Sequence, residues 1–154
     1  MNKKFIICDY ARANWGKTTS LRMVFELLSQ NHLPKEVIWT GDVYNSDVWA
    51  LFEIEGKSIV VCSLGDPCPY HKEFLDKAVK LNVDIIICAA RTSGKTTQNV
   101  DNAKTNGNYE NIFWFQNFNS DKKTELSSQL PEMLDINKFM AEAIIKIALR
   151  LLKF

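Results

Sequence analysis

A lysine and two threonines near the start of the chain have the types and spacing that phosphate binding requires. They form the run Gly16-Lys17-Thr18-Thr19, between an apolar, strand-like segment at 5–8 and a segment with helical periodicity. Backbone N–H groups at a helix N-terminus bind anions. The lysine ammonium would reach the outer phosphates, and the hydroxyl of Thr18 is a suitable ligand for a bridging Mg²⁺. The alternative is a Gly-Lys-Thr tripeptide that only begins a helix.

This stretch resembles the phosphate-binding loop GxxxxGK(S/T) of the P-loop NTPase superfamily, with Ala11 where the first glycine belongs. It is more loosely similar to the ParA/MinD-like branch, whose loops often read GKGGxGK(S/T)T, and to small bacterial P-loop proteins. In that alignment Arg12 matches the branch's signature lysine, whereas Ala13 and Asn14 replace its glycines. The resemblance implies these nucleotide-binding residues: Arg12, Ala13, Asn14, Trp15, Gly16, Lys17, Thr18 and Thr19.

Asp66 is the expected carboxylate on the metal side of this site. The Walker B acid of a P-loop protein ends an apolar strand, and Asp66 follows such a run by a few residues. We expect its side chain to point to solvent and to hold Mg²⁺ or a metal-bound water. The candidate catalytic residues are therefore Lys17 and Asp66, and the candidate metal ligands are Thr18 and Asp66. Asp9 and Asp42 are the alternatives to Asp66.

The chain repeats part of this loop further on, where Gly94-Lys95-Thr96-Thr97 follows an apolar run at 85–88 and Arg91. Few apolar residues follow this second run, so we expect 91–110 to be a poor helix, a lid or a mobile loop. We therefore prefer the first loop as the phosphate site. Arg91 and Lys95 are expected to approach the nucleotide from a neighbouring loop, unless the repeat is chance similarity.

The elements that must position these residues alternate between strands and helices. Apolar runs predict strands at 5–8, 36–40, 47–54, 57–64, 83–90 and 112–115, and helical periodicity predicts helices at 16–29, 70–81 and 135–154. Glu55-Gly56 predicts a hairpin turn. We expect one α/β domain over 1–154, with a mostly parallel sheet, helices on both faces in three layers, and one antiparallel hairpin.

Length and composition are those of an ordinary single domain. The chain has 154 residues, 46% hydrophobic and 24% charged, with a net charge of +1, so nothing indicates binding to nucleic acid. No apolar stretch is long enough to span a membrane, and no signal peptide is indicated. Four cysteines, three of them in or beside apolar runs, favour free thiols in the cytoplasm.

Three functions agree with these patterns. The first is binding and Mg²⁺-dependent hydrolysis of a nucleoside triphosphate, with ATP expected because the guanine-reading NKxD motif is missing. The second is a small-molecule or nucleotide kinase in which Arg12 and Arg91 clamp the second substrate. The third is a non-catalytic interaction module or homodimer, whose contact surface would be formed by Trp39, Tyr44 and Trp49, although core packing explains these three side chains as well.

Overall fold

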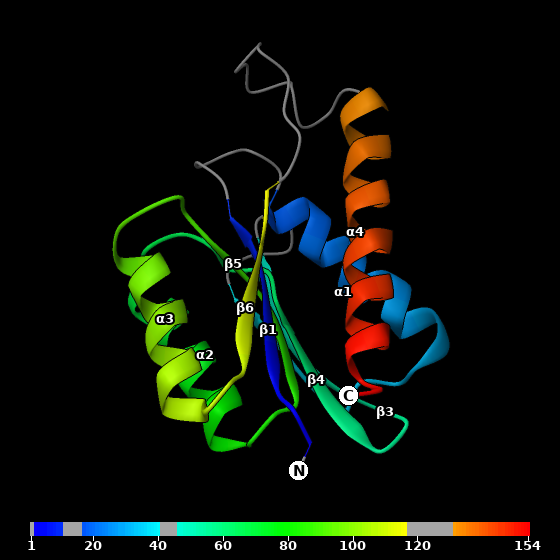
Figure 1. The fold of residues 1–154 in the computed structure, drawn as a ribbon. Helices are drawn as coiled ribbons and strands as arrows, with labels where there is room; N and C mark the ends of the chain where they lie inside the picture. Colours follow the sequence, from blue (N-terminus) through cyan, green and yellow to red (C-terminus); the bar gives the residue numbers. More distant parts are fainter. Residues whose placement is uncertain (1, 11–16, 41–45, 117–130) are drawn as a thin grey trace.

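The computed structural model describes residues 2–10, 17–40, 46–116 and 131–154, without the side chains of residues 17, 18 and 131–135. This part is an α/β structure with one mixed sheet of six strands and four helices (Figure 1). In chain order the elements are β1 (Phe5–Tyr10), α1 (Lys17–Asn31), β2 (Glu36–Thr40), β3 (Asp47–Ile54), β4 (Lys57–Cys62), α2 (Pro69–Lys80), β5 (Ile85–Ala90), α3 (Lys95–Gly107), β6 (Asn111–Phe115) and α4 (Pro131–Leu151).

The strand order is β2-β3-β4-β5-β1-β6, and β3 runs in the direction opposite to the other five strands. The turn between β3 and β4 is formed by Glu55 and Gly56, with φ of 54° and 78°. Positive φ at both central positions matches the strand twist of a tight hairpin. The predicted hairpin within a mostly parallel sheet is therefore confirmed.

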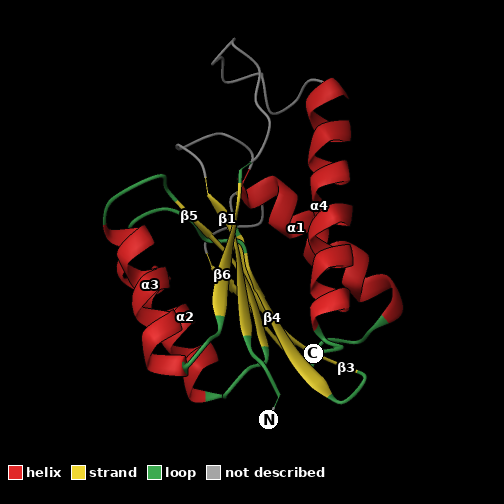
Figure 2. Cartoon of the chain, viewed as in Figure 1, coloured by secondary structure: helices red, strands yellow, loops and turns green. Residues whose placement is uncertain are grey.

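Helices cover both faces of the sheet (Figure 2). Side chains of successive strand residues alternate between the two faces. Ile6 and Ile86 belong to the hydrophobic cluster that includes residues of α2 and α3, whereas Ile7 and Ile87 belong to the cluster that includes residues of α1 and α4. Because β1 and β5 are buried on both faces, they read as continuous apolar runs.

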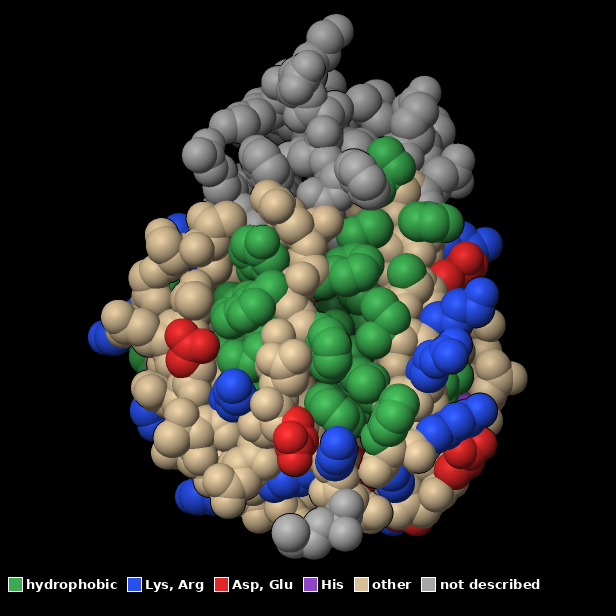
Figure 3. Space-filling view, viewed as in Figure 1, with side chains coloured by type: hydrophobic (Ala, Val, Ile, Leu, Met, Phe, Trp, Pro, Cys, Tyr) green, Lys and Arg blue, Asp and Glu red, His purple; other side chains and the backbone are tan. Residues whose placement is uncertain are grey.

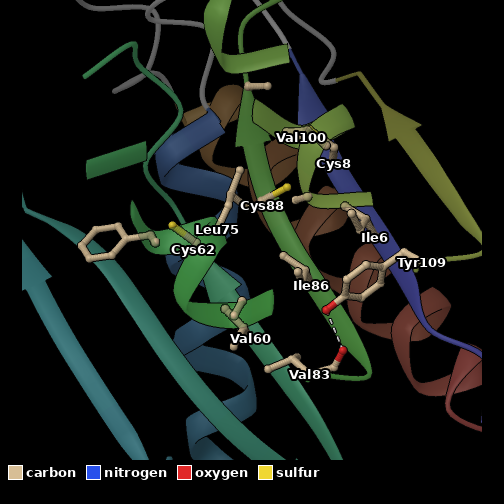
Figure 4. Packing of buried hydrophobic residues seen from close by; sticks show 14 of the residues in the cluster. Ile6, Cys8, Val60, Cys62, Leu75, Val83, Ile86, Cys88, Val100 and Tyr109 are labelled. Atoms are coloured by element: carbon tan, nitrogen blue, oxygen red, sulfur yellow. Dashed lines mark hydrogen bonds between the residues drawn. The ribbon is translucent and has the colours of Figure 1, made fainter. Parts of the chain in front are cut away.

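Three cysteines form a row across the face of the sheet under α2 and α3 (Figure 4). Cys8 and Cys88 are register partners, and Cys62 follows the pair Val61–Ile87. All three side chains are buried. Burial raises the pKa of the Cys62 thiol far above its ordinary value, so this thiol stays protonated and unreactive in the folded protein.

The stretch 91–110 follows the first of its three predicted alternatives, a helix, rather than a lid or a mobile loop. It contains α3, which ends at Asn108 in the left-handed conformation and packs against α2 and β5. Its buried face consists of small residues only: Thr96, Val100, Ala103 and Gly107. Small side chains let the helix approach its neighbours closely, yet they give a weak apolar signal, and this is why the sequence pattern left a lid or a loop open as alternatives.

Candidate functional site

Five strands end at the same edge of the sheet, because β2, β4, β5, β1 and β6 all run in one direction. At this edge β1 leads to α1 on one face, and the adjacent strand β5 leads to α3 on the other face (Figures 1 and 2). In open α/β sheets, ligands bind where neighbouring strands send their helices to opposite faces. The carboxyl ends of β1 and β5 are therefore the candidate site.

The first Gly-Lys-Thr run borders this site. β1 ends at Tyr10 and α1 begins at Lys17, so the predicted strand and helix on either side of the loop are confirmed. Arg12, Ala13, Asn14, Trp15 and Gly16 lie outside the described residues. Lys17 and Thr18 form the start of α1, and Thr19 is half-buried. The first turn of α1 contains no acidic residue that would oppose an anion at the helix N-terminus.

The start of α1 is fixed to α4 by a buried hydrogen bond. Ser20 Oγ donates to Asn137 Oδ1 over 3.1 Å, and both residues are fully buried. A hydrogen bond between two buried side chains is strengthened by the low dielectric of the interior, so this contact links the two helices. The helix turn that contains Lys17 and Thr18 is therefore held by the α4 layer.

Asp9 is a fully buried carboxyl residue at the end of β1. By strand alternation it lies on the face of Ile7, which is the face covered by α1 and α4. Only Tyr10 separates it from the loop that leads to α1. The sequence identified Asp9 as an alternative to Asp66, and Asp9 lies near the end of the strand that leads into the candidate phosphate loop.

The second Gly-Lys-Thr-Thr run forms a closed turn at the start of α3. Gly94 has φ of 95°, a conformation that favours glycine. The Arg91 N–H donates to Thr96 Oγ1 and the Thr97 hydroxyl donates to the Arg91 carbonyl, each over 2.9 Å. Thr96, which corresponds to Thr18 in the repeat, is buried and already engaged. The link from β5 to α3 spans only residues 91–94, whereas that from β1 to α1 spans residues 11–16.

Asp66 points to solvent, as predicted, and is paired with Arg91. The guanidinium Nε and Nη2 lie 3.3 and 3.2 Å from Asp66 Oδ1. The two side chains are 63% and 41% exposed, so the pair contributes little to stability. It joins the loop after β4 to the loop after β5, and β5 separates Asp66 from β1. Lys95 is exposed and is the first residue of α3, directly after the loop that contains Arg91.

Two sets of polar contacts near this edge, those of Ser63 and of His71, were not predicted from the sequence. Ser63 Oγ donates to Asp47 Oδ1 over 2.9 Å and accepts the Val48 N–H over 2.9 Å. Asp47 is the first residue of β3. An antiparallel strand begins at the edge where its neighbours end, so the predicted hairpin could have placed Asp47 at this edge. His71 is buried, and its Nε2 donates to the Ala89 carbonyl over 2.8 Å. Such a contact fixes α2 to the end of β5.

The expected tryptophan surface is wrong for Trp49. This side chain is fully buried, and its indole N–H donates to the Phe74 carbonyl over 3.1 Å. Trp39 is 49% exposed and lies edge-on against Phe25. Tyr44 lies outside the described residues. The alternation of β3 places Trp49 on the α2 face, where the side chain completes the core.

A groove of about 500 Å³ lies elsewhere, between the C-terminal half of α1 and α4. Its lining includes Leu27, Phe139 and Leu149, with Glu142 and Lys146 as charged members. It is at the opposite end of α1 from Lys17 and Thr18. The groove is therefore separate from the candidate site.

Comparison with known proteins gives no family for this chain: no protein-family model and no curated protein matches it. None of the described helices is long and apolar enough to cross a membrane. Within the described residues, no three His, Cys, Asp or Glu side chains gather as a ready metal cage. The site must therefore be interpreted from its own geometry.

Proposed function

We propose that this protein binds and hydrolyses a nucleoside triphosphate, with ATP as the expected substrate, at the carboxyl ends of β1 and β5. The main support is the divergence of α1 and α3 from two adjacent strands, with Gly16-Lys17-Thr18 at the N-terminus of α1. This is the position at which open α/β sheets bind ligands. On this proposal the protein is a member of the P-loop NTPase superfamily.

The two Gly-Lys-Thr runs have different roles in this proposal. The four-residue link at 91–94 is closed by the hydroxyls of Thr96 and Thr97, so it offers no open cradle for phosphate. The longer link before Lys17 has the length of the phosphate-binding pattern. Phosphate therefore binds to the first loop, with Lys17 as its cation. Arg91 and Lys95 contribute positive charge from the other side of the site.

The residues present suit Mg²⁺ as the accompanying metal. Mg²⁺ is held through one or two carboxylates and substrate phosphates rather than by a protein cage. Thr18 and one carboxylate would hold it, and its chemistry when bound is to neutralise phosphate charge. Asp66 must leave Arg91 to take this role. Asp9, which lies on β1 itself, and Asp42, which lies outside the described residues, are the alternatives.

A thermal-shift experiment tests the proposal. Ligand at about a hundred times its dissociation constant adds about 2.7 kcal/mol to stability, which corresponds to a rise of roughly 5–10 °C in melting temperature for a domain of this size. Millimolar Mg-ATP should produce this rise in the wild type, and Lys17→Ala should lose most of it. Lys80→Ala, an exposed lysine at the far end of α2, is the matched control and should keep it.

Phosphate release distinguishes hydrolysis from binding alone. The proposal expects steady Mg²⁺-dependent release of inorganic phosphate by the wild type and its loss in Lys17→Ala. No melting shift with ATP or GTP would refute nucleotide binding. A shift without phosphate release would refute hydrolysis and leave a nucleotide-binding module.

A further inference from the structure

β6 is an edge strand without the usual protection against pairing with another chain. It pairs only with β1 among the described strands, and its sequence Asn-Ile-Phe-Trp-Phe contains no charge, proline or glycine. Edge strands commonly contain charged residues or proline, which prevent edge-to-edge pairing. At the opposite edge, β2 contains Glu36, and Arg22 lies over the exposed ring of Trp39.

β6 exposes aromatic side chains on both faces of the sheet. Phe113 is 37% exposed and Trp114 is 39% exposed. Their register partners in β1 are Ile7 and Cys8, so Phe113 lies on the α1/α4 face and Trp114 on the α2/α3 face. Figure 3 views the molecule from this edge and shows apolar side chains beside β6 and along the adjacent side of α4, with most charged groups around them. The β6 edge therefore lies within an apolar surface.

The outward backbone groups of β6 belong to Ile112 and Trp114. The Phe5 N–H donates to the carbonyl of Asp84, the residue before β5, so the backbone N–H and C=O groups of Phe5 point toward β5. The direction alternates along a strand, so the backbone groups of Ile6 and Cys8 point toward β6. In the β1–β6 register, Phe113 then bonds to β1 and its two neighbours face away. The Ile112 N–H agrees with this, because it donates to the side-chain carbonyl of Asn111 over 2.9 Å.

We propose that two copies of this chain form a homodimer by antiparallel pairing of their β6 strands, with the two-fold axis at Phe113. In this register the Ile112 N–H of each copy leaves the Asn111 side chain, and Ile112 exchanges N–H···O bonds with Trp114 of the other copy. The two Phe113 side chains lie together at the axis. No charged residue of the strand meets its own copy. The interface is isologous, as in most homodimers, and the two sheets become one continuous sheet.

A second copy of the chain suits this edge because the two-fold symmetry that pairs the β6 strands also brings the two α4 helices side by side. A two-fold axis normal to the sheet keeps each face on its own side, so α4 of one copy lies beside α4 of the other. A stable dimer buries about 800 Å² per partner, more than a five-residue strand provides alone. The apolar surface that continues from β6 onto α4 adds to this area (Figure 3).

Solution mass tests this proposal. Size-exclusion chromatography with light scattering on the full chain at about 100 μM should give about 35 kDa, twice the 17.7 kDa of one chain. Phe113→Lys places two ammonium groups together at the axis and should give the monomer mass, with dimerisation weakened at least 100-fold. Trp39→Lys introduces the same charge at the β2 edge and should remain dimeric. A monomeric wild type, or a dimeric Phe113→Lys, overturns the proposal.

Amide hydrogen exchange on the wild type gives a test that needs no variant. The Trp114 N–H should be protected at high protein concentration and should exchange faster on dilution, because its partner carbonyl belongs to the second copy. The Phe113 N–H, which bonds to β1, should exchange at the same rate throughout. Exchange at Trp114 that does not change with concentration between dimer and monomer overturns the proposed register.

Discussion

The substitution Tyr109→Phe removes one hydroxyl group and tests how much the hydrogen bond between Tyr109, which follows α3, and Val83, which precedes β5, contributes to stability. Tyr109 is 4% exposed, and its hydroxyl donates to the Val83 carbonyl over 2.7 Å (Figure 4). The change keeps the ring and leaves a buried carbonyl without its donor, which costs about 1–3 kcal/mol. At roughly 2–4 °C per kcal/mol for a chain of this size, the melting temperature should fall by about 2–12 °C.

The same hydroxyl makes this difference depend on pH. Burial raises the pKa of Tyr109 above its ordinary value of 10.0. Below pH 10 the phenol is protonated in both the folded and the unfolded chain, so its contribution to stability is fully present. Above pH 10 only the unfolded chain ionises, and the wild type loses stability, by about 1.4 kcal/mol at pH 11. Tyr109→Phe lacks this loss, so the gap between the two proteins should narrow.

Chemical denaturation at pH 8 and pH 11 measures both effects. Tyr70→Phe is the matched control, because Tyr70 is 56% exposed on α2, and it should change stability by less than about 0.5 kcal/mol at either pH. A Tyr109→Phe protein as stable as the wild type at pH 8 would refute the role of the hydrogen bond. A gap that stays constant between the two pH values would refute the burial argument.

Three further substitutions have defined outcomes. Asp66→Asn should leave the melting temperature of the ligand-free protein within about 2 °C, since the Arg91 pair is exposed, and should cut phosphate release at least tenfold if Asp66 holds the metal. Lys95→Ala should weaken ATP binding by about 10- to 150-fold, the size of one charge-assisted hydrogen bond, and by no more than Lys17→Ala does; the reverse order in an ATP titration would assign the site to the second loop. Gly107→Ala would place a Cβ 2.3 Å from the Tyr109 ring, and denaturation should show a loss of about 1–3 kcal/mol, whereas an unchanged protein would mean that the ring moves freely.

Elements with a strong apolar pattern could be predicted from the sequence. Leu21, Val24 and Leu28 repeat at helical spacing and are buried in α1 as expected. The run at 85–90 is continuous and buried on both faces, as a central parallel strand requires. The Glu55-Gly56 turn follows from local backbone preference. These features depend on residues close together in the chain, so a single sequence contains them.

Features that depend on distant residues were not predictable in the same way. The strand order places β5 between β1 and β4, and no local pattern specifies which strands become neighbours. The pairing of Asp66 with Arg91, which are 25 positions apart, follows from that order. The same holds for Asp47 and Ser63, whose contact depends on the β3–β4 register. The sequence therefore predicted which strand ends are followed by the candidate residues, but not the contacts among those residues.

The reactivity of the buried thiols should measure local unfolding of the helices on one face of the sheet only. Cys8, Cys62 and Cys88 all lie under α2 and α3, and Cys68, only partly buried, directly precedes α2. The chain has four cysteines, so none belongs to the α1/α4 layer. A thiol reagent attacks the thiolate, so the three buried cysteines can react only while α2 or α3 is away from the sheet. Labelling followed by mass spectrometry should show one fast site and three slow ones. The slow rate then measures the local unfolding of one layer, separately from its opposite.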